Sequence, residues 1–461
     1  IIKGNNLLTL TTLLPVYRGK IKLIYLDPPF NTNSSANTFS YNNSFNHSTW
    51  LSFMRNRLIA AKQLLSEDGI LVTAIDHYEL FYLGVLADEI FARDNRMGVI
   101  SVIHNPGGRQ DETFFPTAHE NMLFYAKNIL NVKLNRLPAT KEKLAEYKLT
   151  DKFGRYKLRG FRRSGNNSLR SQRPGLFYPI YYDPLSDQFA LDSVNKHMVK
   201  LLPIDKDGVE RCWRWSSERF ILNIEKYIEI KKTKDEYTIY IKERESDYEG
   251  EKAKTICHKP YYSGQTGTNE LKNDFQEKVF SYPKSPYLIK DIIHICTNDG
   301  DIILDCFGGS GTTAKAVTQL NQENNGNRKF ILCEQMNYID KVTIKRIEKN
   351  LSSNHTFCYA ELTKLNGKYI DEINKSNSTK DLIRIWQSIK KGGFLSIKVD
   401  PKEFDKNVSN FEKLNLEDQK KFLIKVLDKN HLYVNYSEIN DKDYGIIDED
   451  KRLNKQFYSL K

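Results

Sequence analysis

The feature that most constrains the fold is an apolar run that ends in a glycine-rich turn. Residues 299–320 read DGDIILDCFGGSGTTAKAVTQL, which predicts a buried strand, a turn with three glycines and an amphipathic helix. Glycine lets the backbone approach a ligand closely, and the first turn of a helix presents N–H groups that lack intrahelical partners. The stretch therefore indicates a layered α/β fold with a candidate ligand site where this strand ends.

The same alternation of strands and helices occurs near the start of the chain and again after the glycine turn. The predicted elements are strands at 21–27, 70–76, 98–104 and 328–335, and helices at 49–69 and 77–91. Gly69 follows the last apolar residues of the first helix, where we expect a C-cap. Two separate parts of the chain are therefore expected to build one sheet.

A long basic segment interrupts this alternation. Residues 131–275 are rich in Tyr and Arg, are punctuated by prolines and lack sustained helical periodicity, so we predict a separate insert. The chain then divides into 1–130, the insert 131–275, a second part of the α/β domain at 276–360, and a C-terminal accessory domain with short helices at 361–461.

The net charge of +12 is concentrated in the insert. Residues 131–173 contain thirteen Lys and Arg against three acids, and the part from 153 to 173 contains no acid. A polyanion would bind such a stretch well, because each phosphate that is neutralised releases counterions. A solvated basic surface is the alternative. The candidate DNA-binding residues are the seven bases of the acid-free part, Arg155, Lys157, Arg159, Arg162, Arg163, Arg170 and Arg173.

Composition argues against membrane and metal-dependent classes. No apolar run is long enough to cross a bilayer, and the first residues lack the pattern of a signal peptide, so we expect a cytoplasmic protein. The six cysteines occur singly without a CxxC pair, so we expect neither a disulfide framework nor a metal site.

The glycine turn fits several kinds of ligand. Gly309, Gly311 and Ala314 match the G-x-G-x-x-A dinucleotide fingerprint, and Glu334 ends the next predicted strand, where an acid can hold ribose hydroxyls. These residues do not distinguish three interpretations: a nicotinamide or flavin enzyme, an S-adenosylmethionine (AdoMet) enzyme, and a turn that binds no ligand. A Walker A loop is excluded, because no Gly-Lys-Ser/Thr sequence occurs.

A second motif, Asp27-Pro28-Pro29-Phe30, follows the first predicted strand. Two consecutive prolines stop the ladder of hydrogen bonds and leave carbonyl groups without neighbouring N–H donors. Asp27 and these carbonyls form an acceptor cluster that suits an exocyclic amino group, and Phe30 offers a face for stacking a planar base. The alternative is a strand that ends at proline with a capping Asp.

Together, DPPF and the downstream DCFGGSGTT resemble the motifs of the DNA amino-methyltransferases, which methylate adenine N6 or cytosine N4. The order of the two motifs is that of the β class. Further stretches, including WLSFMRNRLIAAKQLLSEDGILVTAIDHYE, HENMLFYAK, FSYPKSPYLIKDII and the tail after residue 430, are similar to the Mod subunits of type III restriction-modification systems.

The resemblance implies a Rossmann-like AdoMet-dependent methyltransferase sheet in permuted order, with the ends of the strands before Asp27 and Asp305 side by side. A flipped adenine would stack on Phe30, and Asp27 with the Pro28 carbonyl would accept its amino hydrogens. Asp at the first motif position favours adenine N6 over cytosine N4. The residues implied in AdoMet binding are Asp305, Phe307, Gly309, Ser310, Gly311, Thr312, Thr313, Glu334, Lys284 and Ser285.

The resemblance also implies partners. The insert would be the target recognition domain for double-stranded DNA, and the loop 31–48 would line the flipped base or contact the displaced strand. The accessory domain would serve homodimerisation or a restriction endonuclease subunit. The alternatives are an N4-cytosine methyltransferase, a non-catalytic recognition subunit of a nuclease complex and a nicotinamide oxidoreductase.

Overall fold

The computed structural model describes residues 1–32, 45–108, 113–233, 236–336, 338–351, 355–362, 367–392 and 401–427. The chain divides into two compact units: unit 1 comprises residues 1–135 and 253–461, and unit 2 comprises residues 136–252. The insert is therefore shorter than the predicted 131–275. Residues 253–275 belong to unit 1 because β13 (Ile256–Cys257) pairs in parallel with β4 (Arg96–Ile103).

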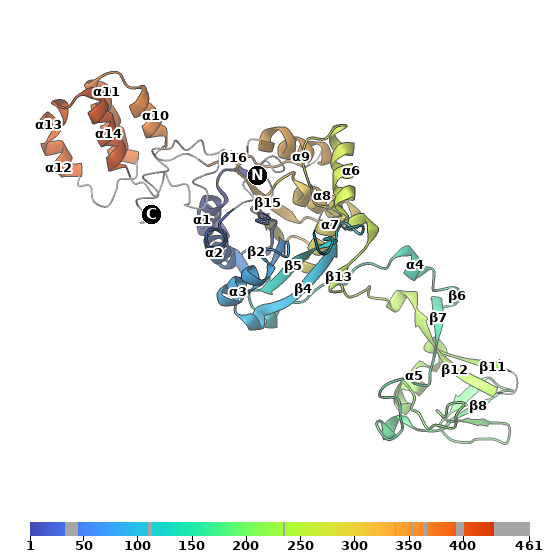
Figure 1. The fold of residues 1–461 in the computed structure, drawn as a ribbon. Coiled ribbons are helices and arrows are strands. Elements are labelled where there is room, and N and C mark those ends of the chain that lie inside the picture. Colours follow the sequence, from blue (N-terminus) through green and yellow to red (C-terminus); the bar gives the residue numbers. More distant parts are fainter. Residues whose placement is uncertain are drawn as a thin grey trace. The chain divides into compact units, whose positions relative to one another are not determined.

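Unit 1 is built on a nine-stranded mixed sheet (Figure 1). The order across the sheet is β13, β4, β5 (His119–Ala126), β3 (Leu65–Ile75), β2 (Ile21–Leu26), β14 (Ile302–Asp305), β15 (Lys329–Glu334), β1 (Ile2–Lys3) and β16 (Ala360–Glu361). Strand β5 runs antiparallel to both of its neighbours, and the other pairs are parallel.

The centre of the sheet joins the two separate parts of the chain. Strands β2 and β14 are parallel neighbours, with Ile303 opposite Leu23 and Asp305 opposite Tyr25. Their carboxyl ends therefore lie side by side, as the resemblance implied. In an open α/β sheet this edge is where ligands bind.

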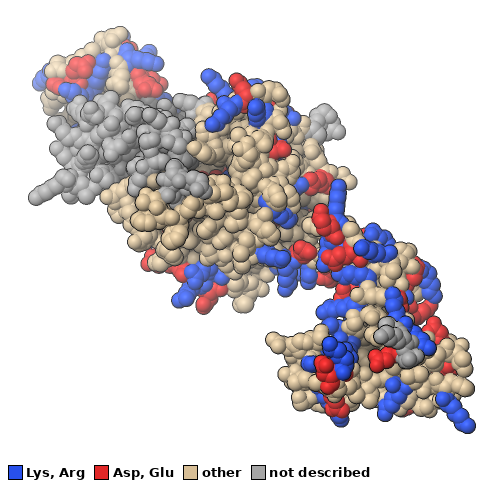
Figure 2. All heavy atoms as spheres, turned by 45° about the vertical axis from the view of Figure 1, so that its right-hand side comes forward, with Lys and Arg blue, Asp and Glu red and all other residues tan. Residues whose placement is uncertain are grey.

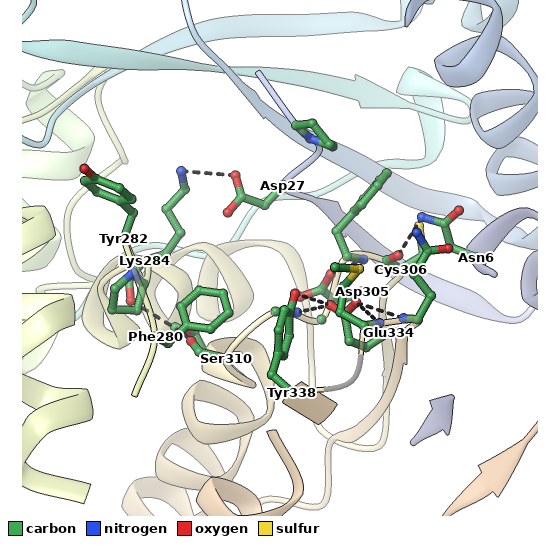
Figure 3. Close-up of a pocket in the computed structure, with 18 of the residues that line it drawn as sticks. Asn6, Asp27, Phe280, Tyr282, Lys284, Asp305, Cys306, Ser310, Glu334 and Tyr338 are labelled. Atoms are coloured by element: carbon green, nitrogen blue, oxygen red, sulfur yellow. Dashed lines mark hydrogen bonds and ion pairs between the residues drawn. The ribbon is translucent and has the colours of Figure 1, made fainter. Parts of the chain in front are cut away.

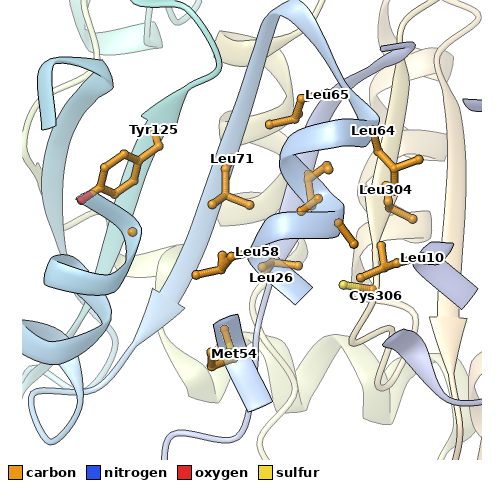
Figure 4. Packing of buried hydrophobic residues seen from close by; sticks show 14 of the residues in the cluster. Leu10, Leu26, Met54, Leu58, Leu64, Leu65, Leu71, Tyr125, Leu304 and Cys306 are labelled. Atoms are coloured by element: carbon orange, nitrogen blue, oxygen red, sulfur yellow. The ribbon is translucent and has the colours of Figure 1, made fainter. Parts of the chain in front are cut away.

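Helices cover both faces of the sheet (Figure 1). One set comprises α1 (Asn6–Tyr17), α2 (His47–Leu64) and α3 (Leu80–Phe91). The other comprises α6 (Gly264–Phe275), α7 (Pro286–Cys296), α8 (Thr312–Asn324) and α9 (Ile344–Asn350). The first set shares a buried core with β2, β3 and β14, in which Leu10, Leu58, Leu71 and Leu304 pack together (Figure 4).

The predicted role of Gly69 was wrong. Helix α2 ends at Leu64, and Gly69 lies inside β3. A Cβ at this position would lie 2.8 Å from the carbonyl oxygen of Ser66 and 3.0 Å from that of Ile21. Glycine is therefore needed for a close backbone approach within the sheet, where no helix ends.

Unit 2 combines two small antiparallel sheets with one helix. The first sheet contains β11 (Ile228–Thr233), β12 (Glu236–Arg244), β7 (Gly154–Gly160) and β6 (Leu149–Asp151). The second contains β10 (Val199–Leu201), β8 (Ile180–Asp183) and β9 (Gln188–Ala190). Their shared core includes Phe161 stacked on Trp213, with ring centroids 5.1 Å apart.

The sequence did not predict helix α5 (Ser217–Tyr227) in unit 2. Its N-cap is Ser216, whose side chain accepts a hydrogen bond from the backbone N–H of Arg219. Phe220 is the only fully buried residue on this helix. Phe220 and Ile224 lie four positions apart and pack on the same core, so the sequence does contain a helical spacing here that the prediction of an insert without helices missed.

The predicted short C-terminal helices are present in the described part of the chain. They are α10 (Gly367–Lys375), α11 (Thr379–Gly392), α12 (Pro401–Lys406), α13 (Val408–Glu412) and α14 (Leu416–Val426). Trp386, Leu382 and Leu423 are buried in a core of their own. The tail after residue 427 lies outside the described residues. Within the described residues, no helix has the length and apolar content to cross a bilayer.

Candidate functional site

A pocket opens at the carboxyl ends of β2, β14 and β15 (Figure 3). It is lined by the segment after β2, the glycine turn, the end of β15 and residues 280–284. Of the predicted site residues, Asp27, Pro29, Lys284, Asp305, Phe307, Gly309, Ser310, Thr312 and Glu334 line it. Pro28, Phe30, Ser285, Gly311 and Thr313 do not, although each is next in sequence to a residue that does.

The two prolines have different surroundings. The indole N–H of Trp50, in α2, donates a hydrogen bond of 2.8 Å to the Pro29 carbonyl. No described residue donates to the Pro28 carbonyl, which leaves it as an acceptor beside Asp27. Phe30 is half-buried against the core of unit 1. The contact with Trp50 therefore holds the turn and selects the carbonyl that stays available.

The loop after Phe30 is anchored at both ends. Asn31 has a positive φ of 58°. Its side-chain amide donates to Glu79 at 2.7 Å, and its side-chain oxygen accepts from the backbone N–H of Phe45 at 2.6 Å. Most of the predicted loop, residues 33–44, lies outside the described residues.

Lys284 contacts the acid of the DPPF motif. Its ammonium nitrogen lies 3.0 Å from Asp27 Oδ1 and 2.9 Å from Glu120 Oε2, and it is 4.5 Å from the centroid of the Phe30 ring. No described residue donates to Asp27 Oδ2. Ser285, by contrast, donates its hydroxyl to the Tyr261 carbonyl at 2.6 Å and is buried away from the pocket.

The charges of this cluster influence one another. Burial raises the pKa of Asp27 above its ordinary value; Lys284 opposes the rise and Glu120 adds to it. Burial alone would lower the pKa of Lys284, but Asp27 and Glu120 together raise it. Lys284 is therefore an ammonium ion that favours the ionised form of Asp27.

Asp305 holds the glycine turn in shape. Its carboxylate accepts a hydrogen bond from the backbone N–H of Phe307 at 2.9 Å and from the hydroxyl of Thr313 at 2.6 Å. Burial raises the pKa of Asp305 to about 7. Gly311 has a φ of 77°, and a Cβ there would lie 3.3 Å from Cγ2 of Thr343. The turn is therefore fixed by its own side chains and by a position that favours glycine.

Glu334, at the end of β15, is oriented by four donors. The backbone N–H groups of Gln335 and Met336 donate to Oε1 at 2.8 and 3.0 Å. The backbone N–H of Gly309 and the hydroxyl of Tyr338 donate to Oε2 at 2.8 and 3.0 Å. Burial raises the pKa of Glu334, and these hydrogen bonds oppose the rise. The acid is thus tied to the glycine turn.

Several residues of the site gave no sequence signal. Arg346, in α9, is fully buried and donates to the hydroxyls of Ser310 at 3.1 Å and Thr312 at 2.9 Å. Phe280 and Tyr338 line the pocket with their rings edge to face, at a centroid distance of 5.1 Å. Glu120 and Lys284 meet across 164 positions of sequence, a separation that no local pattern can indicate.

The predicted DNA-binding residues are mostly ion-paired within unit 2. Arg155 pairs with Glu245, Lys157 with Glu146, Arg159 with Glu243 and Arg170 with Glu210, at 2.7–3.0 Å. Arg162 donates to the Ile204 carbonyl, and Arg173 to the Asn167 side chain. Figure 2 shows acidic and basic side chains mixed over the visible face of unit 2. Four of the seven candidate bases therefore have an acidic partner within the unit.

Comparison with known proteins gives one family. A family model described as DNA methylase matches residues 21–345. The EcoPI Mod subunit of a type III restriction-modification enzyme, from Escherichia phage P1, is 31% identical over 416 residues, which cover 82% of this chain. The chain spans 62% of that relative's length.

Two further relatives agree. The type II methyltransferase M.KpnI of Klebsiella pneumoniae is 34% identical over 348 residues, which cover 74% of this chain and 81% of the relative. The EcoP15I Mod subunit of Escherichia coli is 27% identical over 408 residues, which cover 72% of this chain and 57% of the relative.

Proposed function

This chain belongs to the DNA methylase family, and on that premise we propose that it transfers the methyl group of AdoMet to an exocyclic amino group of a base in DNA. The observation that supports this most strongly is the shared pocket of Asp27 and the glycine turn, which follow the parallel neighbours β2 and β14. An acceptor for an amino group and a cradle for a nucleoside-like cofactor thus face the same space.

The pocket residues fit AdoMet. Gly309 and Ser310 line it where the turn leads into α8, and the rings of Phe280 and Tyr338 provide an apolar wall for an adenine ring. Because four donors already occupy the Glu334 carboxylate, a ribose hydroxyl would replace the Tyr338 hydroxyl as its donor. Bound AdoMet supplies an electrophilic methyl group on a positively charged sulfur. The cavity residues hold this group close to Asp27.

The DPPF turn positions the target base. Asp27 Oδ2 and the Pro28 carbonyl are the two acceptors without described partners, so they accept the two amino hydrogens and direct the nitrogen lone pair at the methyl group. The base must leave the duplex to reach them, at a cost of about a few kcal/mol. Phe30 is not given the stacking role expected from the sequence, because its ring packs on the core and the Lys284 ammonium lies 4.5 Å from its centroid. The nitrogen attacks the methyl carbon directly as the carbon–sulfur bond breaks, and it loses one proton toward Asp27. No covalent intermediate with the protein is needed, so positioning and electrostatics account for most of the rate.

Lys284 is a positioning residue in this scheme. It holds Asp27 Oδ1 at 3.0 Å, which leaves Oδ2 for the substrate, and its charge keeps Asp27 ionised inside a buried pocket. Glu120 holds Lys284 in turn at 2.9 Å. From the sequence, Lys284 was expected to bind AdoMet. We propose instead that it positions Asp27, the acceptor for the amino group.

We assign the target atom to adenine N6. Asp27 occupies the first position of the motif, and an Asp at this position resembles the pattern of the adenine-specific members of the β class. Cytosine N4 is the alternative, because both bases present an exocyclic amino group of the same geometry.

The partners follow from the relatives and from unit 2. Two relatives are named as Mod subunits of type III restriction-modification enzymes, and we propose that this chain likewise modifies DNA for a restriction endonuclease subunit in the bacterial cytoplasm. Unit 2 is the DNA recognition domain. The C-terminal helices, with their separate core, serve homodimerisation or the contact with that subunit.

Methyl transfer from labelled AdoMet to unmethylated bacterial DNA tests the proposal. The wild-type protein is expected to label DNA, whereas Asp27→Asn, which keeps the shape of the side chain and removes its charge, is expected to reduce transfer at least a hundredfold and still bind AdoMet. Ser285→Ala is the control, since its hydroxyl points to the Tyr261 carbonyl. Full transfer by Asp27→Asn would refute the role of Asp27, and its loss of AdoMet binding would make Asp27 a structural residue.

A further inference from the structure

Unit 2 contains a hollow lined mainly by cations and aromatic rings. Eight Lys and Arg side chains line it, against two acids. Five of these cations are ion-paired. Lys143 and Lys157 pair with Glu146, Arg159 pairs with Glu243, and Lys242 and Arg244 pair with Asp151, at 2.7–3.1 Å. These five cations share three carboxylates, which offset part of their charge.

Arg163, Arg214 and Arg219 are the three cations of the hollow without an ion-pair partner among the described residues. Arg214 donates its Nε–H to the Gly160 carbonyl at 2.8 Å, and the Arg219 guanidinium lies 4.6 Å from the centroid of the Trp215 ring. The Nε of Arg163 is buried and has no hydrogen-bond partner among the described residues. We call these three residues the arginine cluster.

Backbone pairing brings the cluster together. The N–H of Arg163 donates to the Cys212 carbonyl at 2.9 Å, and the N–H of Arg214 donates to the Phe161 carbonyl at 3.1 Å. Two segments that are remote in sequence thus place Arg163 and Arg214 beside each other. Burial lowers the pKa of Arg214, and the charges of Arg159 and Arg163 lower it further. Arg163 and Arg214 therefore repel each other, and Glu243 offsets part of this repulsion.

We propose that the arginine cluster binds one phosphate of the DNA backbone. This rests on the proposed function, and it names the ligand within unit 2. A phosphate offsets the repulsion among the guanidinium groups and accepts the planar pairs of N–H donors that arginine presents. A neutral base as the ligand would leave the repulsion between the guanidinium groups uncompensated. The cluster therefore fixes the position of the duplex and does not read its sequence.

The test measures DNA binding by the full chain as a function of salt. Arg163→Gln and Arg214→Gln are each expected to weaken binding to duplex DNA about tenfold at 0.1 M salt. Each is also expected to reduce the slope of log K against log salt by about 0.9, the value for one phosphate. Because both arginines hold the same phosphate, the double variant should lose about 0.9 and not about 1.8.

Arg136→Gln is the matched control, since it removes an equal charge from an arginine of the same unit that is paired with Glu249 and is not among the candidate DNA-binding residues. An equal loss of slope in this control, or a loss in the Arg163 and Arg214 variants confined to one DNA sequence, would overturn the proposal. An unchanged slope in both variants would also overturn it. If the wild-type protein binds DNA and the two variants bind it equally well, only the role of the cluster is refuted. A wild-type protein that binds no DNA would refute the proposed function.

Discussion

At the scale of single residues, the proposed methyl transfer depends on the contacts that position Asp27. Lys284 occupies one carboxylate oxygen, Glu120 holds Lys284, and Trp50 occupies the carbonyl of Pro29. These contacts come from parts of the chain that are far apart in sequence. Together they leave Asp27 Oδ2 and the Pro28 carbonyl without a donor among the described residues, and these are the two acceptors that we propose for the substrate.

This arrangement predicts opposite pH effects for two variants. Asp27 must be ionised to accept an amino hydrogen, so the acid limb of kcat/KM reports its pKa. Lys284→Gln removes a charge that lowers the pKa of Asp27, so the limb should move to higher pH. Glu120→Gln removes a charge that raises the pKa of Asp27, so the limb should move to lower pH.

The measurement is the pH profile of methyl transfer at subsaturating DNA. Lys284→Arg, which keeps the positive charge, is the control and should restore most of the wild-type profile. Limbs that move in the same direction in the Gln variants, or do not move, would show that Lys284 and Glu120 only stabilise the fold.

At the scale of elements, the glycine turn between β14 and α8 is the part with the strictest backbone requirement. Gly311 has a φ of 77° and lies against Thr343. Gly311→Ala should therefore lower the free energy of unfolding by about 1–2 kcal/mol and weaken AdoMet binding. Gly84, inside α3, has no atom within 4 Å of a Cβ position. Gly84→Ala should raise the free energy of unfolding by about 0.5–1 kcal/mol.

Urea unfolding with and without AdoMet measures both changes. Changes of the same sign in the two alanine variants would contradict the backbone argument. If Gly311→Ala loses stability but binds AdoMet as the wild type does, the turn is a structural feature and does not hold the cofactor.

Sequence reasoning predicted some of these elements well and others poorly. Strands β2 and β3 followed from continuous apolar runs, because both of their faces are buried, and helices α2 and α3 followed from apolar residues at helical spacing. Helices α6 and α7 were not predicted. The adjacency of β2 and β14 came from the family resemblance, since pairing across nearly three hundred residues leaves no local pattern. Gly69 was misplaced because a glycine after a helical pattern looks the same whether it caps a helix or allows strands to approach. The Lys284 contacts needed the three-dimensional structure.

At the scale of the whole molecule, the candidate catalytic residues and the proposed phosphate-binding arginines lie in different units. Unit 1 contains the pocket with Asp27 and the glycine turn, and unit 2 contains the arginine cluster. The net charge of +12 does not by itself identify a DNA surface, because most bases of residues 153–173 pair with acids of the same unit. Which cations are unpaired is therefore more informative than how many there are.

The central claim is that the chain methylates an amino group of DNA at the DPPF pocket. The most direct test is digestion of DNA treated with the wild-type protein and AdoMet, followed by identification of the modified nucleoside by mass spectrometry, with Asp27→Asn as the control. The account predicts N6-methyladenine from the wild type and none from the variant. N4-methylcytosine would contradict the base assignment, and unmodified DNA from a folded protein that binds AdoMet would contradict the claim itself.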